Sequence, residues 1–247
     1  MRTPEEPALT PAEPLPWRRR RLDPGRGLGL RLTVAAVAAF LVLVPFALLA
    51  VLAVAGWAPL HRLDLTVADS LHSGVVGHPV VIRAMLIWSD VFDPNSLRVA
   101  ALVLVIWLIR RRARRMALWV ATTMAVGGLL GMLLKLLVGR HRPDLLDPVA
   151  RAAGYSFPSG HALNAALAGG VFLLVFLPLV RRRRALLWIA AIIVTVVTGL
   201  CRMALGVHWT SDVAGGWILG IAVVAATSAA FVPWRHQPTR SSAGREA

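Results

Sequence analysis

Long apolar stretches alternate with short polar segments along most of this 247-residue chain. A helix that crosses the hydrocarbon core of a membrane needs about 20 mostly apolar residues. Six stretches reach or approach that length, and we place them at residues 32–57, 97–109, 117–138, 161–180, 185–200 and 213–232. The pattern predicts an all-α fold, a polytopic membrane helix bundle with six transmembrane helices.

The second of these stretches has the least definite boundary. Residues 97–109 are too few to span a membrane and must recruit residues from the polar turn 93–96 or beyond. Residues 80–88 are also largely apolar, although Arg83 interrupts them. Periodicity alone leaves open whether they form an interfacial or re-entrant helix on the outer side or the start of the second span.

The composition supports a membrane protein. Hydrophobic residues make up 57% of the chain and the mean hydropathy is +0.67, against roughly 45–50% apolar residues in soluble domains. Tryptophans lie near the ends of the predicted spans, as in the aromatic belts of membrane proteins. They are Trp57, Trp107, Trp119, Trp188 and Trp234.

The basic residues indicate how the chain is oriented. The net charge is +15, and the arginine runs lie before the first span, between spans two and three, between spans four and five, and after the sixth. Because cytoplasmic loops carry an excess of Lys and Arg, we expect both termini in the cytoplasm and the other loops on the outer face of the cell membrane. This distribution argues against a nucleic-acid partner, whereas arginine runs suit anionic lipid headgroups.

The two ends of the chain differ from its apolar middle. Residues 1–30 are rich in proline and arginine, and we expect them to form a disordered cytoplasmic N-terminus. Residues 31–234 form the six-span domain, and residues 235–247 form a cytoplasmic tail. The first apolar stretch is longer than the roughly 7–15 residues of a signal-peptide core, so we interpret it as a span. The single cysteine, Cys201, excludes an intrachain disulfide.

Polar residues interrupt the apolar pattern at three places, all on the predicted outer side. At the first, Gly139 and Pro143 should end the third helix, so that Lys135 lies about one turn inside the outer surface. Arg140 and Arg142 then lie in the following loop. A lysine and a forked guanidinium together can hold phosphate oxygens. The alternative is that these long side chains only snorkel to the membrane surface.

The second place is the segment Pro158-Ser159-Gly160-His161, directly before the fourth span. Backbone N–H groups of Ser159 and Gly160 at a helix N-terminus can bind an anion, and His161 can donate a proton near neutral pH. The alternative is that Ser159 is an ordinary helix N-cap.

The third place holds Arg202, His208 and Asp212. The histidine and the aspartate are four residues apart, which on a helix places them on one face. Asp212 would then fix the imidazole tautomer and leave the other nitrogen of His208 free to act as a nucleophile. The alternative is a helix cap made by Thr210, Ser211 and Asp212.

The two imidazoles and the carboxylate of these segments could also hold zinc. Three nearby cations, Lys135, Arg142 and Arg202, would repel a metal ion and attract an anion, so we expect neither a metal nor a cofactor. The remaining histidines are expected to have no chemical role, although His141 is close enough to line the site. They are His61, His72, His78, His141 and His236.

Together the three segments resemble the three-part signature of the type 2 phosphatidic acid phosphatase superfamily, which the vanadium haloperoxidases share. The segments are Lys135-Leu-Leu-Val-Gly-Arg-His-Arg142-Pro143, Tyr155-Ser-Phe-Pro-Ser-Gly-His161 and Arg202-Met-Ala-Leu-Gly-Val-His208-Trp-Thr-Ser-Asp212. The resemblance covers residues 97–232 and keeps the order and spacing of the motifs. The chain departs from the pattern at Cys201, where the superfamily usually has serine, a better hydrogen-bond donor.

The resemblance implies a role for each motif residue. His208 would attack phosphorus to form a phosphohistidine, Asp212 would orient it, and His161 would protonate the leaving oxygen. The phosphate would be held, without a metal, by Lys135, Arg142, Ser159, Gly160 and Arg202. Arg140 would be an accessory phosphate contact only.

The membrane setting implies that the substrate is a lipid phosphate, hydrolysed as a phosphomonoester or a diphosphate. Phosphatidate, phosphatidylglycerol phosphate and undecaprenyl diphosphate all present such a group. Two alternatives stay open, a lipid phosphotransferase and a non-catalytic transporter or scaffold that binds lipid headgroups. We expect substrate specificity to come from tail grooves and from residues 60–95, and the sequence does not fix the oligomeric state.

Overall fold

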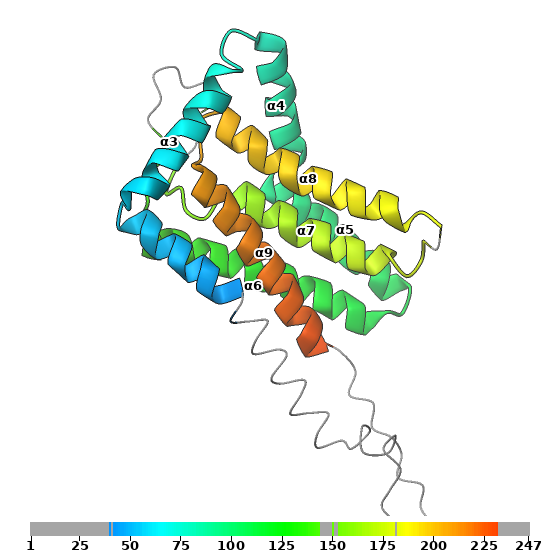
Figure 1. Ribbon diagram of the computed structural model, residues 1–247. Helices are drawn as coiled ribbons and strands as arrows, with labels where there is room; N and C mark the ends of the chain where they lie inside the picture. The colour runs from blue at the N-terminus through cyan, green and yellow to red at the C-terminus, as the bar shows by residue number, and fades with distance from the viewer. Residues whose placement is uncertain (1–39, 41, 144–149, 151–152, 181, 232–247) are drawn as a thin grey trace, which may run out of the picture. The chain divides into compact units, whose positions relative to one another are not determined.

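Helices account for all regular structure in the described part of the chain (Figure 1). The computed structural model describes residues 40, 42–143, 150, 153–180 and 182–231. The predictions for residues 1–30 and 235–247 therefore fall outside the described residues. The helices are Val42–Val54, α3 (Ala58–Ser73), α4 (Pro79–Val91), α5 (Pro94–Arg110), α6 (Arg114–Val138), α7 (Gly160–Phe176), α8 (Arg184–Ala204) and α9 (Thr210–Phe231).

The local sequence sets where several helices begin and end. Each of α3, α4 and α5 has a proline in its first turn. Proline is tolerated there because the first N–H groups of a helix have no hydrogen-bond partner within the helix. The side chain of Asp93 caps α5 by accepting a hydrogen bond from Asn95 N at 2.7 Å. At its other end, α6 is closed by Gly139, whose φ of +61° is a left-handed conformation that glycine adopts readily.

Three helices, α6, α8 and α9, are long and apolar enough to cross a membrane by themselves. The number rises to five if each of two bent helix pairs is one span. Val42–Val54 meets α3 at 87°, and α4 meets α5 at 40°. The predicted all-helical fold is confirmed. The described residues hold three to five candidate spans, and the number of six stays a prediction.

The boundaries explain part of this difference. The helix that contains the predicted span 97–109 is α5, which begins at Pro94 in the polar turn 93–96. Residues 80–88 belong to α4, which forms a bent pair with α5. The predicted span 161–180 stops as a helix at Phe176. Pro178 follows closely, and the residue before a proline is disfavoured in helical conformation.

The α7 helix is the centre of the packing and contacts α5, α6, α8 and α9 (Figure 1). Small residues at helix contacts let neighbouring backbones approach closely in membrane proteins. Leucines of α7 fill the space that glycines of α6 leave. Leu167 lies over Gly127 and Leu163 over Gly131, and an added Cβ atom at either glycine would come within 2.4 Å of a leucine methyl carbon.

The start of α7 lies directly against the first turns of α9. A Cβ atom added at Gly216 would lie 2.8 Å from the carbonyl oxygen of Ser159 and 3.0 Å from the backbone nitrogen of Leu163. Ser159 N also donates a hydrogen bond to Asp212 O at 2.9 Å. These contacts bring the second and third polar segments of the sequence side by side.

We expect Gly216→Ala to destabilise the protein by about 1–3 kcal/mol, because its methyl group would overlap backbone atoms that move only with a whole helix. The measurement is the apparent midpoint of thermal unfolding in detergent. Gly128→Ala on α6 is the matched control, since the nearest atom to its Cβ would be Arg98 Nη2 at 3.8 Å. Equal midpoints for the two variants would contradict the close contact between α7 and α9.

Candidate active site

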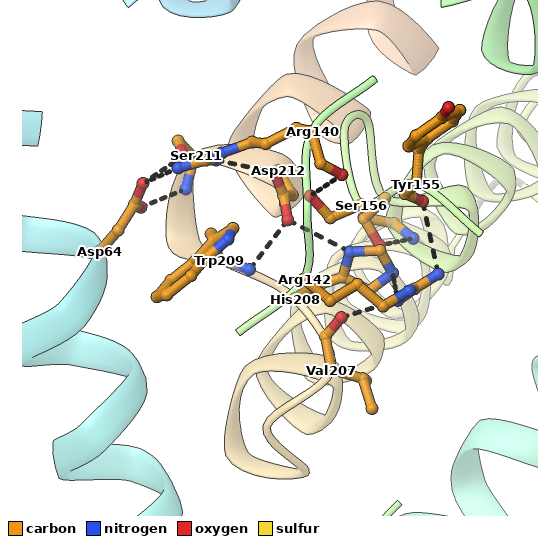
Figure 2. Close-up of polar contacts among 12 residues, drawn as sticks. Asp64, Arg140, Arg142, Tyr155, Ser156, Val207, His208, Trp209, Ser211 and Asp212 are labelled. Atoms are coloured by element: carbon orange, nitrogen blue, oxygen red, sulfur yellow. Dashed lines mark hydrogen bonds and ion pairs between the residues drawn. The ribbon is translucent and has the colours of Figure 1, made fainter. Parts of the chain in front are cut away.

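The polar segments meet at one end of the helices, where His208 and Asp212 form a pair (Figure 2). His208 lies in the turn between α8 and α9, after Gly206 with its φ of +73°, and Asp212 lies in the first turn of α9. His208 Nδ1 is 3.3 Å from Asp212 Oδ2. The spacing predicted that both residues lie on one face of a helix. In the structure His208 precedes α9, but it still pairs with Asp212.

Asp212 is fully buried and has two further hydrogen bonds. Its Oδ2 accepts from Trp209 N at 2.9 Å, and its Oδ1 accepts from Arg140 Nη1 at 2.8 Å. The hydrogen bond from Trp209 N caps the start of α9, which is the alternative role predicted for Asp212. The same carboxylate therefore caps α9 and contacts His208. An ionised Asp212 requires the proton of His208 on Nδ1, which leaves Nε2 with its lone pair.

Burial lowers the pKa of His208 from 6.5 to about 4, against the opposing effect of the hydrogen bond to Asp212. The positive charges of Arg142 and Lys135 lower this pKa further. The imidazole is therefore neutral at neutral pH. A neutral imidazole with a fixed Nδ1–H is the form in which Nε2 can act as a nucleophile.

Arg142 fills its hydrogen-bonding capacity inside the site. Its pKa is lowered by burial, and Asp212 opposes that effect. One of its N–H groups, on Nη1, points at His208 Nε2 across 3.2 Å. The others donate to backbone carbonyl oxygens, from Nε to Gly154, from Nη1 to Val207, and from Nη2 to Ala153 and Tyr155, at 2.7–3.4 Å.

Lys135 and Ser159 lie close to the start of α7. Lys135 Nζ donates to the carbonyl oxygen of Tyr155 at 2.7 Å, and its Cε would lie 3.9 Å from a Cβ atom at Gly160. The lysine thus bends toward the loop and the helix terminus. Ser159 is fully buried and is the N-cap of α7, with its Oγ accepting from Ala162 N at 3.5 Å, as the capping alternative predicted.

His161 projects from the first turn of α7 toward the junction of α4 and α5. Its Nε2 lies 3.7 Å from Asp93 Oδ2, the residue that caps α5. Residues 60–95 therefore contribute directly to the surroundings of this histidine. Among the described residues, no group of three or more His, Cys, Asp or Glu side chains is arranged to hold a metal ion.

Arg202 is a buried cation that forms no ion pair among the described residues, although the charges of Asp93 and Asp90 reach it at longer range. The residue is 8% exposed, and its Nε has no hydrogen-bond partner among the described residues. It lies within electrostatic reach of Arg142 and His161. Because a buried charge without a partner is costly, this position favours an anion bound between the two arginines.

Sequence reasoning missed Asp64 and misjudged Arg140. The two side chains form an ion pair at 2.7 Å, so the predicted accessory phosphate contact faces carboxylates in the structure. The signal in the sequence was one carboxylate, Asp64, between Leu63 and Leu65, and the structure buries Asp64 while the two leucines are 52% and 41% exposed. In an apolar setting, a carboxylate on the inward face of a helix indicates a partner inside the bundle.

Comparison with known proteins identifies the segment that carries this site. Residues 116–236 match the family model described as the PAP2 superfamily, which confirms the resemblance. The chain is 40% identical over 96 residues to phosphatidylglycerophosphatase B of Bacillus subtilis, covering 38% of this chain and 47% of that one. It is 34% identical over 120 residues to an undecaprenyl-diphosphatase of Sulfolobus acidocaldarius, covering 46% and 54%.

A third similar protein is the lipid A 1-phosphatase of Rhizobium etli, with 34% identity over 125 residues that cover 44% of this chain and 50% of that one. The chain thus spans about half the length of the curated relatives it matches. The crystal structure of a transmembrane PAP2-type phosphatidylglycerolphosphate phosphatase from Bacillus subtilis has the same fold. The TM-score is 0.70 at 23% sequence identity, over 77% of this chain and 94% of that one.

We expect His208 to stay neutral until the pH falls toward about 4. The measurement is the ¹⁵N NMR titration of histidine-labelled protein in detergent micelles, with a His208→Gln spectrum for assignment. Asp212→Asn should lower the pKa further, because the carboxylate is the group that favours the charged imidazole. A midpoint near 6.5 for His208 would contradict the burial that the structure assigns to it.

Arg202→Gln should weaken the binding of inorganic phosphate by about 10- to 100-fold, since hydrogen bonds to a charged group contribute about 1.5–3 kcal/mol. Isothermal titration of the detergent-solubilised protein measures this change. Arg98→Gln is the matched control, because Arg98 is an exposed arginine of α5 that bonds Asn95. Equal losses for the two variants would show that Arg202 has no particular role toward anions.

Proposed function

Through residues 116–236 this chain belongs to the PAP2 superfamily, and on that premise we propose that it is a membrane lipid phosphate phosphatase. The observation that carries the proposal is the buried guanidinium of Arg202, which forms no ion pair among the described residues. It lies within electrostatic reach of Arg142, the residue that contacts the neutral His208. An anion completes this arrangement electrostatically, and a neutral imidazole can attack it. Positive charge next to a nucleophile is the requirement for phosphoryl transfer.

The reaction begins with attack by His208 Nε2 on the phosphorus of the substrate. A nitrogen–phosphorus bond forms and the bond from phosphorus to the leaving oxygen breaks. His161, acting in its imidazolium form, gives the leaving oxygen its proton and becomes neutral. Asp212 keeps Nδ1 of the nucleophile oriented and balances its positive charge in the phosphohistidine. A water molecule, deprotonated by His161, then displaces the histidine and releases inorganic phosphate.

The cations bind the phosphate and stabilise the charge that builds on its equatorial oxygens. Arg202 contributes a buried guanidinium that forms no ion pair among the described residues, and Arg142 turns its Nη1 from His208 to the substrate. Lys135, together with the backbone N–H groups at Ser159 and Gly160, completes the cradle at the start of α7. None of these roles calls for a metal ion.

A lipid phosphate is the class of substrate that this position suits. The relatives are named for phosphatidylglycerophosphate, undecaprenyl diphosphate and lipid A, and each of these molecules carries a phosphate group on a lipid anchor. The helices that carry the site present exposed apolar side chains, including Leu136 and Leu137 next to Lys135. A tail that stays in the bilayer can therefore lie against α6 while the phosphate reaches the cations.

The proposed topology has six spans, with both termini and residues 1–30 and 235–247 in the cytoplasm and the site on the outer face. It is supported by the two ends of α6 and α7. The arginine run at 110–115 lies where α5 ends and α6 begins, and Arg182–Arg184 lead into the first turn of α8. Lys135 and His161 are at the opposite ends of the same helices, as the positive-inside rule requires.

We expect His208→Ala to reduce phosphate release at least about a thousandfold, because the attacking atom is lost. The assay uses purified protein in mixed micelles with EDTA and offers phosphatidate, phosphatidylglycerol phosphate or undecaprenyl diphosphate. His78→Ala, a change of an exposed histidine at the start of α4, is the control.

The outcomes of this assay separate the alternatives. Release that persists in His208→Ala would refute the histidine mechanism. Loss of the lipid phosphate without release of inorganic phosphate would point to a phosphotransferase. No reaction of the wild-type protein with any of the three lipids would contradict the proposed class of substrate.

A further inference from the structure

Asp64 of α3 makes three short contacts, two with Ser211 in the first turn of α9 and one with Arg140 (Figure 2). The residue is completely buried. Its Oδ1 accepts from Ser211 N at 2.9 Å, and its Oδ2 accepts from Ser211 Oγ at 2.6 Å and from Arg140 Nη2 at 2.7 Å. Arg140 Nη1 completes the ring of contacts by donating to the same Ser211 Oγ at 2.6 Å.

Arg140 is the link between this carboxylate and that of Asp212. Its Nη1 donates to Asp212 Oδ1 at 2.8 Å, while Nη2 is bound to Asp64. The guanidinium carbon also lies 5.5 Å from the centre of the Trp209 ring, a cation–π contact. With both terminal nitrogens on carboxylates, Arg140 has its charge engaged by protein groups rather than left for a phosphate.

We propose that Asp64 and Arg140 are positioning residues of the active site, in which Asp64 holds Arg140 so that Arg140 occupies only Oδ1 of Asp212 and leaves Oδ2 to His208. The proposal rests on the proposed function, since it concerns the same histidine. It assigns a role to α3, which lies outside the family-matched residues 116–236.

The charges explain why two carboxylates are needed. A single guanidinium between two buried carboxylates shares its charge, so it does not neutralise Asp212 fully. Without Asp64, the whole charge of Arg140 would act on Asp212 and weaken its hold on His208. Without Arg140, both carboxylates would lose a buried counterion, and Oδ1 of Asp212 would be free to compete for the imidazole proton.

The test compares Asp64→Asn, Arg140→Gln and the double variant with Asp69→Asn and Arg62→Gln, which change exposed residues of α3. For the first two variants, kcat for phosphate release should fall about 10- to 100-fold, as when outer-shell partners of a site are removed. KM and the inhibition constant of inorganic phosphate should stay unchanged. The two losses should not add in the double variant, because one residue acts through the other.

A second readout distinguishes positioning from simple loosening of the fold. Arg140→Gln should raise the pKa of His208, since Asp212 then acts on it unopposed, whereas Asp64→Asn should lower it. The other charged groups that face His208 are Arg142, Lys135, Asp212 and His161, from the loop after α6, from α6, from α9 and from α7, and none of them changes. The ¹⁵N titration needs no activity, so it stays informative if the proposed function fails.

Several results would overturn the proposal. A rise in KM with unchanged kcat would make Arg140 a phosphate contact. Shifts of the His208 pKa toward 6.5 in both variants would show only that the site had opened to water. If Asp64→Asn does not fold, Arg140→Lys replaces it; this variant keeps the charge but loses the fork, so wild-type kcat in it would refute the positioning role. Loss of activity in His208→Ala, measured in parallel, shows separately that the proposed reaction holds.

Discussion

The burial of one carboxylate, that of Asp212, is the constraint on which the arrangement of the site depends. An ionised group inside an apolar bundle must have its hydrogen bonds satisfied, and removing one partner of such a pair costs about 3–5 kcal/mol. The partners of Asp212 come from three places, the turn before α9, the loop after α6, and, through Arg140, α3. Segments up to 148 positions apart are therefore held together by the need to compensate one charge, as the separation of Asp64 and Asp212 shows.

The close packing of small residues makes that compensation possible. Glycines of α6 make room for leucine side chains of α7, and glycines of α9 lie against the α7 backbone, so the start of α7 lies beside the first turn of α9. Two histidines that are far apart in the chain, His161 and His208, are thereby brought to one end of the bundle. The packing supplies rigidity, and the buried ion pairs supply orientation; neither would position the imidazoles by itself.

The sequence predicts the parts of this protein that local patterns determine. Apolar runs report the helices around residues 117–138, 185–200 and 213–232, and polar residues inside such runs point to the motif residues. The breaks before α3 and α5 have local signals, a proline in the first turn of each helix. The bend angles of 87° and 40° have none, because they depend on how the arms pack rather than on apolar content. Asp64 was missed for a similar reason, since its partner Arg140 lies 76 residues away and only the folded chain brings them together.

The hydrogen bonds of Arg142 have a consequence for how the site exchanges ligands. In the resting protein its guanidinium is already engaged, largely by carbonyl oxygens of the loop before α7. A phosphate that enters must displace these oxygens from Arg142. Its affinity therefore reflects the contacts that Arg142 gains with the phosphate minus those that it loses with the carbonyl oxygens. The same oxygens reclaim the guanidinium when the reaction is over. The loop thus acts as a built-in competitor that favours release of the product and repeated turnover over tight binding.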